Sequence, residues 1–154
     1  MEKLIQHILL ADDDLDDCEL FKCALNELDF KIQFSTVGNG EALMQMLSGS
    51  QLLPDILFMD INMPRKTGIE CMAEIKSNPL LQHLCVVVLS TTINQANVNI
   101  LYANGAHHYF CKPDNFLALK SLVQKTITLV SQNKSVSKDD ICNQPLKENF
   151  VLTP

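Results

Sequence analysis

The sequence lacks three features that would each indicate a large class of proteins: excess basic charge, a long apolar run and paired cysteines. Its 154 residues contain 12 lysines and arginines against 18 acidic residues, a formal net charge of -6. This charge repels phosphate backbones and anionic lipids, so we expect neither nucleic acid nor a membrane as a partner. Because no stretch reaches membrane-spanning length and no signal-peptide pattern opens the chain, we predict a cytoplasmic protein.

The six cysteines are scattered singly, with no C-x-x-C pair among them. A zinc site needs closely spaced thiolate or imidazole ligands, and a disulfide framework is typical of small secreted chains. We therefore interpret the cysteines as reduced, small and mostly buried apolar residues.

What the sequence does contain is a regular alternation of strand-like and helix-like segments. Hydrophobic residues make up 47% of the chain, enough at this length for one domain that buries roughly 68–70% of its unfolded surface. The alternation predicts a parallel α/β sheet covered by helices on both faces. The expected strands are 6–11, 31–36, 56–60, 84–90 and 106–112, and the expected helices are 14–28, 40–47, 68 to about 77, 93–103 and 115–130. In the second helix we expect Leu43, Met46 and Leu47 to face the core.

Polar side chains gather where the expected strands end, and ligands bind at the carboxyl ends of strands in an open parallel sheet. The residues at these ends are Asp12, Asp13, Asp60, Ser90 and Lys112. Three crowded carboxylates repel one another, and Mg²⁺ relieves this because it accepts carboxylates, a carbonyl and several waters. We expect Asp13 and Asp60 as direct ligands, the carbonyl of Asn62 as a third, and Asp12 to act through water.

A carboxylate held beside Mg²⁺ and a lysine is suited to attack a phosphoryl group, since the loose transition state needs positioning and charge neutralisation. Lys112 supplies a compact positive charge and Ser90 a hydroxyl donor. The expected product is an acyl phosphate on Asp60.

Four segments, "ILLADDD", "MDINMPRKTG", "VVVLST" and "GAHHYFCKP", occur in the order and at the spacing of a known family. Over residues 6–130 the chain resembles the response-regulator receiver domain of bacterial two-component signalling. The resemblance implies a flavodoxin-like, doubly wound, five-stranded parallel sheet of order 2-1-3-4-5 with five helices. It also implies that Asp60 is the phosphoacceptor, that Asp12 and Asp13 are the acidic metal-binding pair, and that the carbonyl of Asn62 binds Mg²⁺.

The same resemblance assigns the switch residues: Ser90 matches the hydroxyl switch, Lys112 the invariant lysine, and Tyr109 the aromatic residue that rotates inward on activation. Three positions tune the dephosphorylation rate in the family, and Asn62, Thr91 and Thr92 occupy them here. Thr91 stands where many receivers have alanine, and Thr92 offers no acid or amide to orient water. We therefore expect a long-lived phosphoryl group.

The expected organisation is a receiver domain over 1–131 and a polar C-terminal tail over 132–154 without an effector domain. We expect the tail to be disordered, although residues 150–152 give its end an apolar hook. The chain is thus similar to stand-alone regulators that pair with phytochrome-like histidine kinases. The resemblance implies a phosphoryl group received from a histidine kinase or a histidine phosphotransfer protein. It also implies a readout face, which is also a homodimer interface, on the fourth helix, fifth strand and fifth helix.

Three other functions compete with this one. A phosphatase of the haloacid-dehalogenase type needs a second aspartate two positions after the nucleophile, where this chain has Asn62. A flavin mononucleotide carrier needs a phosphate-binding loop after the first strand, and "ADDDLDD" would repel the phosphate. A pseudo-receiver that acts as a scaffold without phosphorylation stays open. We expect that this protein is not an enzyme, except that it catalyses its own phosphorylation and dephosphorylation.

Overall fold

Buried apolar runs form the two central strands of a single parallel sheet. The computed structural model describes residues 4–49, 52–133 and 144–154. Its strands are β1 (His7–Ala11), β2 (Gln33–Val37), β3 (Ile56–Asp60), β4 (Val86–Ser90), β5 (His108–Cys111) and β6 (Val151–Leu152). Strands β3 and β4 are buried at every position, as continuous apolar runs in a sheet covered on both faces require. The strand order is β2-β1-β3-β4-β5-β6.

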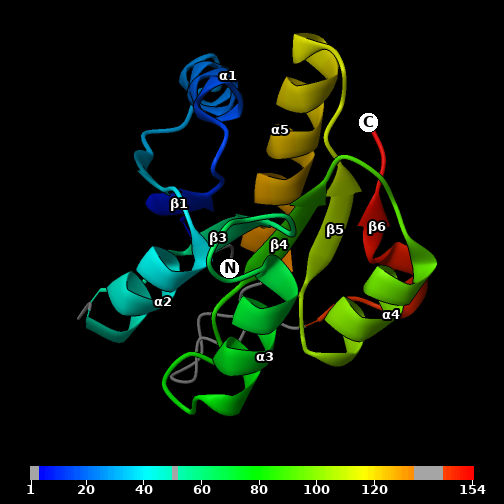
Figure 1. The fold of residues 1–154 in the computed structure, drawn as a ribbon. Helices are drawn as coiled ribbons and strands as arrows, with labels where there is room; N and C mark the ends of the chain where they lie inside the picture. Colours follow the sequence, from blue (N-terminus) through cyan, green and yellow to red (C-terminus); the bar gives the residue numbers. More distant parts are fainter. Residues whose placement is uncertain (1–3, 50–51, 134–143) are drawn as a thin grey trace.

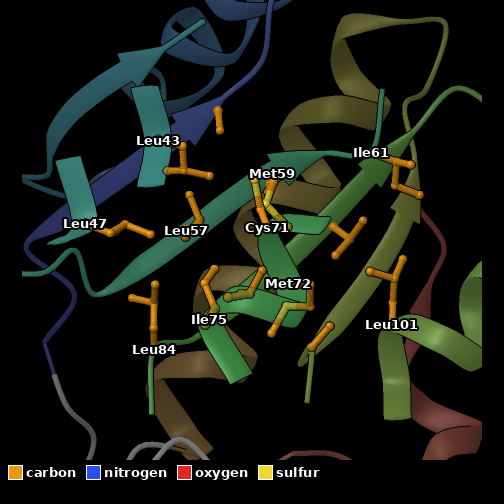
Figure 2. Close-up of a cluster of buried hydrophobic side chains, with 14 of the residues drawn as sticks. Leu43, Leu47, Leu57, Met59, Ile61, Cys71, Met72, Ile75, Leu84 and Leu101 are labelled. Atoms are coloured by element: carbon orange, nitrogen blue, oxygen red, sulfur yellow. The ribbon is translucent and has the colours of Figure 1, made fainter. Parts of the chain in front are cut away.

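Helices cover the sheet on both sides and make three layers. They are α1 (Leu15–Asn26), α2 (Gly40–Gly49), α3 (Gly68–Ser77), α4 (Gln95–Ala103) and α5 (Phe116–Asn133), with a short 3-10 helix η1 (Lys147–Asn149). Helices α1 and α5 lie together on one face, and α2, α3 and α4 lie on the other (Figure 1). Figure 2 shows the core under the second group, where Leu43, Leu57 and Met72 converge from a helix, a strand and another helix.

The predicted elements and the order 2-1-3-4-5 are confirmed, and each predicted boundary lies within three residues of the observed one. One predicted core residue is wrong. Met46 is 41% exposed, and Met44 is buried in its place beside Leu43 and Leu47. The buried arc of α2 is centred on Gly40, Leu43, Met44 and Leu47, so Met46 falls at its edge.

The prediction of a disordered tail is wrong for residues 144–154. Phe150 is fully buried, and β6 extends the sheet by pairing with β5, Val151 opposite Tyr109 and Leu152 opposite Phe110. The apolar residues 150–152 therefore pack against the folded domain. The edge of β5 and the aromatic side chains beside it form the apolar surface that these three residues cover. Residues 134–143 lie outside the described part of the chain.

Most of the described cysteines are buried, as predicted. Cys18, Cys71 and Cys85 are buried, Cys111 is half-buried and Cys23 is exposed. Burial raises the pKa of both Cys18 and Cys71 to about 11, which keeps these thiols protonated. Within residues 4–49, 52–133 and 144–154, no helix has the length and apolarity needed to cross a membrane.

Candidate functional site

The carboxyl ends of β1 and β3 bring three aspartates together. One carboxylate oxygen each from Asp12, Asp13 and Asp60 lies within 4.8 Å of the others. Asp12 and Asp60 are buried, at 2% and 5% exposed, and Asp13 is exposed to solvent. Register explains the placement, because β1 pairs with β3 from Ile8 opposite Ile56 onward, so both strands end at the same level. The predicted convergence of these three residues is confirmed.

Lys112, directly after β5, reaches into this cluster. Its Nζ donates to Asp12 Oδ2 at 2.7 Å, to Asp60 Oδ2 at 3.1 Å and to Asp17 Oδ2 at 2.8 Å. Asp12 and Asp60 were predicted to gather with Lys112 at the ends of the strands, and Asp17 was missed. Asp14 caps α1 by accepting from the amides of Asp16 and Asp17, and this helix start turns the Asp17 side chain toward the lysine.

The site carries more negative charge than one lysine balances. Burial raises the pKa of Asp12 to about 6, although its hydrogen bond with Lys112 works against the rise. Burial also disfavours the charge on Lys112, but hydrogen bonds to Asp12 and Asp17 raise the pKa of the lysine above its ordinary value. The lysine therefore stays protonated at neutral pH. A divalent cation would stabilise the ionised carboxylates and remove the tendency of Asp12 to take up a proton.

The donor set fits a hard divalent cation, since all three clustered groups are carboxylates. Asn62 lies beside them, two residues after β3, where its backbone amide donates to Asp60 Oδ1 at 3.1 Å. That bond orients the Asp60 carboxylate. The cluster thus supports a site for a divalent ion, held by Asp12, Asp13 and Asp60.

Ser90 ends β4, one residue after Leu89, which pairs with Asp60, and it is linked through Thr92 to Tyr109. The Thr92 amide donates to Ser90 Oγ at 3.3 Å, and the Tyr109 hydroxyl donates to the Thr92 carbonyl at 3.0 Å. Tyr109 is fully buried. The Thr91 carbonyl accepts a contact from Cys111 Sγ at 3.2 Å, and the Thr91 and Thr92 side chains are exposed. Of the three predicted tuning positions, Asn62 contacts Asp60 directly, and Thr91 and Thr92 follow Ser90 at the carboxyl end of β4.

A tight loop over residues 61–68 joins β3 to α3 and packs against the backbone of Asp60. The Gly68 amide donates to the Ile61 carbonyl at 2.8 Å, which brings the start of α3 against the end of β3. The Thr67 hydroxyl and the Glu70 carboxylate then cap α3 reciprocally. A Cβ at Gly68 would lie 2.6 Å from the Asp60 carbonyl oxygen. The close approach therefore requires glycine and fixes the backbone of Asp60.

A doubly wound sheet with an acidic cluster, a lysine and a serine at its carboxyl edge defines a class of signalling phosphoacceptors, and comparison with known proteins gives the family. The family model of the response regulator receiver domain matches residues 8–124. The chain is 32% identical over 122 residues to response regulator Rcp1 of Synechocystis sp., an alignment that covers 76% of this chain and 83% of that protein. The chain belongs to the response regulator receiver domain family.

Solved structures agree with this assignment. The phosphorylated cyanobacterial phytochrome response regulator RcpA superposes with a TM-score of 0.76 at 31% identity, covering 86% of this chain and 97% of that one. The Mn²⁺-bound form of response regulator Rcp1 superposes with a TM-score of 0.76 at 28% identity, covering 86% of this chain and 99% of that one. Family and fold are thus established together.

Proposed function

We propose that this protein is a response regulator that accepts a phosphoryl group on Asp60, with Mg²⁺ bound, and thereby switches a partner-binding face. The observation that carries the proposal is the buried Asp60 carboxylate beside Lys112 and the acidic pair Asp12 and Asp13. Similarity to a protein whose structure was solved in phosphorylated form supports the same chemistry here. Similarity to an Mn²⁺-bound regulator supports the metal.

In the proposed reaction an Asp60 oxygen attacks the phosphorus of a phosphohistidine. A P–O bond forms, the P–N bond breaks, and the electron pair stays with the departing imidazole. Mg²⁺, held by Asp12, Asp13, Asp60 and the Asn62 carbonyl, would supply charge neutralisation for the phosphoryl oxygens. Lys112 and the Ser90 hydroxyl would then bind those oxygens. Lys112 would thereby lose its contact with the Asp60 carboxylate and gain one with the phosphoryl group.

Such an exchange is large enough to operate a switch. A phosphoryl group forms about one to three new charge-assisted hydrogen bonds, each worth roughly 1.5–3 kcal/mol. Moving a two-state element from 1:99 to 99:1 takes about 5.5 kcal/mol. The contacts from Ser90 through Thr92 to Tyr109 give the signal a route toward β5 and α4.

The proposed donor is a sensor histidine kinase or a histidine phosphotransfer protein, and relatives named as phytochrome response regulators favour a phytochrome-like kinase. The proposed readout and homodimer face comprises α4, β5 and α5. We further propose that the protein is bacterial and cytoplasmic, and that it catalyses no reaction other than its own phosphorylation and dephosphorylation. The proposed receiver domain spans 1–131, and the segment 132–154 follows it.

Intact mass measured after incubation with acetyl phosphate tests the proposal. We expect a gain of one phosphoryl group that requires Mg²⁺ and that neutral hydroxylamine removes, since hydroxylamine cleaves an acyl phosphate and leaves a serine phosphate intact. If the protein binds Mg²⁺ and gains no mass from acetyl phosphate or from a cognate kinase, the pseudo-receiver scaffold replaces this proposal.

The lifetime of the phosphoryl group gives a second prediction. Because the exposed Thr92 side chain carries neither an acid nor an amide to orient water, we expect hydrolysis over minutes or longer. The loss of the added mass after removal of acetyl phosphate measures this lifetime. As a matched comparison, Thr92→Glu should shorten it by roughly a hundredfold, the lower end of the range for general acid–base help. Hydrolysis of the wild type within seconds would contradict the prediction.

Asp17 gives a third prediction. Its hydrogen bond to Lys112 is charge-assisted but about a third of its side chain is exposed, so we discount the usual contribution to about 1 kcal/mol. Asp17→Ala should slow phosphorylation by acetyl phosphate about fivefold, since Lys112 loses one of three partners. Asp17→Glu should restore most of the rate, and Mg²⁺ affinity should change little because Asp17 is outside the acidic cluster. An unchanged rate would show that Asp12 and Asp60 suffice to hold the lysine.

A further inference from the structure

Residues 144–154 cover the edge of β5 and are held there by both neighbouring helices. Gln144 Nε2 donates to the carbonyls of Tyr102 and Ala106 at 2.7 and 2.8 Å, and the Tyr102 hydroxyl donates to the Pro145 carbonyl at 2.8 Å. On the other side Lys125 Nζ of α5 donates to the Thr153 carbonyl at 3.2 Å. Figure 1 shows β6 alongside β5, with α4 below it. The segment thus touches α4, β5 and α5, the three elements of the proposed readout face.

Phe150 is the anchor of this segment. It is fully buried, its ring centroid lies 5.2 Å from that of Tyr102 in an edge contact, and it lies 6.3 Å from that of Tyr109. Its carbonyl also accepts from the Tyr109 amide at 3.0 Å. The chain has two tyrosines and no tryptophan, so both of its tyrosines adjoin this one phenylalanine.

Tyr109 is therefore held from two directions. On its inner side the hydroxyl bonds to the Thr92 carbonyl, and the Thr92 amide bonds to Ser90. On its outer side the Phe150 ring packs against it. An outward rotation of Tyr109 would break the bond to Thr92 and would move the ring into space that Phe150 fills. The inward position of Tyr109 and the docked position of the segment consequently favour each other.

We propose that residues 144–154 form an intramolecular latch whose docking on β5 stabilises the phosphorylated state of Asp60 by holding Tyr109 inward. The inference rests on the proposed function, since it assumes that a phosphoryl group fixes Ser90 and the adjoining Thr92 backbone. Coupling between two sites is reciprocal. A phosphoryl group on Asp60 must then tighten the latch by the same factor by which the docked latch stabilises the phosphoryl group.

The first test uses the unaltered protein, with Mg²⁺ and beryllofluoride, an anion that binds an aspartate in the shape of a phosphoryl group. The Tyr109 amide reports docking directly because Phe150 accepts its hydrogen bond. We expect beryllofluoride to slow hydrogen exchange at this amide by at least about fivefold, the lower bound of typical coupling. The Gln33 amide, which bonds to Gln6 at the opposite edge of the sheet, is the control and should change much less.

The second test measures the affinity for beryllofluoride at fixed Mg²⁺. Phe150→Ala removes the anchor and should weaken binding by at least about fivefold, while Phe150→Leu, which keeps most of the volume, should recover much of the loss. Leu146→Ala alters a residue of the same segment that is 65% exposed, and it should bind as the wild type does. Thermal unfolding checks that each variant is folded. If Phe150→Ala does not fold, the affinity of Phe150→Leu for beryllofluoride and the exchange experiment on the wild type test the latch instead.

The outcomes separate the latch from the function on which it rests. A wild type that binds Mg²⁺ but neither beryllofluoride nor a phosphoryl group overturns the proposed function. A wild type that binds beryllofluoride with unchanged Tyr109 exchange, or with an affinity insensitive to Phe150→Ala, overturns the latch alone. Faster exchange or tighter binding by the variant also overturns it, because the sign is then reversed. Tyr109 protection that disappears on dilution overturns the intramolecular arrangement in favour of docking on a second copy.

Discussion

Asp60→Asn should abolish the mass gain from acetyl phosphate completely, because an amide oxygen at this position has no negative charge with which to attack phosphorus. The variant should fold, since Lys112 keeps its contacts with Asp12 and Asp17. Removing one carboxylate from three should also weaken Mg²⁺ binding by roughly tenfold or more, the loss of a direct ligand from a site that depends on few protein oxygens. Intact mass and a Mg²⁺ titration measure the two effects.

Asp16→Asn is the matched control for this change. Asp16 is an exposed aspartate in the first turn of α1, so the same chemical substitution removes a charge of the same sign without touching the cluster. We expect it to retain phosphorylation and Mg²⁺ binding. A phosphoryl group on Asp60→Asn that hydroxylamine removes would assign the phosphoacceptor to another carboxylate, and Asp13, exposed and adjacent, would be examined next.

The site residues that could be predicted from sequence are those that end a strand or directly follow one. A buried run that ends on a carboxylate fixes both the strand and the direction of its last side chain, so Asp60 was placed by the run before it. The same holds for Ser90, the last residue of β4, and for Lys112, which directly follows β5.

Asp17 could not be found in this way. It is one of five aspartates among residues 12–17, and which of them faces the lysine depends on where α1 begins. The signal lay in the capping position of Asp14, which places Asp17 in the first turn of the helix. Only the distance from β5 to α1 in three dimensions shows that this turn comes within reach of Lys112.

The docked segment was missed for a different physical reason. β6 has two residues, too few for any periodicity, and composition alone favoured disorder for the polar residues around it. Its stability comes from contacts with Tyr102, Tyr109 and Phe110, which lie about 40 residues earlier in the chain. Tertiary packing of this kind leaves no pattern in the local sequence. The isolated apolar triplet at 150–152 did correctly indicate that apolar side chains are buried here.

Gly68→Ala should strongly destabilise the protein beside the site. The new Cβ would lie 2.6 Å from the Asp60 carbonyl oxygen and 2.8 Å from Ile61 Cα, and both are backbone atoms that cannot rotate away. The loop over 61–68 would have to move off β3, which breaks the bond from Gly68 to Ile61. We expect a loss of about 3 kcal/mol, the upper part of the range for overpacking, and a fall in melting temperature of about 6–12 °C.

The matched control is Gly49→Ala, where an added Cβ meets nothing within 4 Å at the end of α2. Alanine is favoured over glycine in helices and restricts the unfolded chain, so this variant should be neutral or more stable by up to about 1 kcal/mol. The comparison also bears on function: if Gly68→Ala folds, displacement of Asp60 should slow its phosphorylation, while Gly49→Ala should phosphorylate at the wild-type rate. Equal stabilities of the two variants would mean that the 61–68 loop does not press against β3, and the fixed position of the phosphoacceptor would then need another cause.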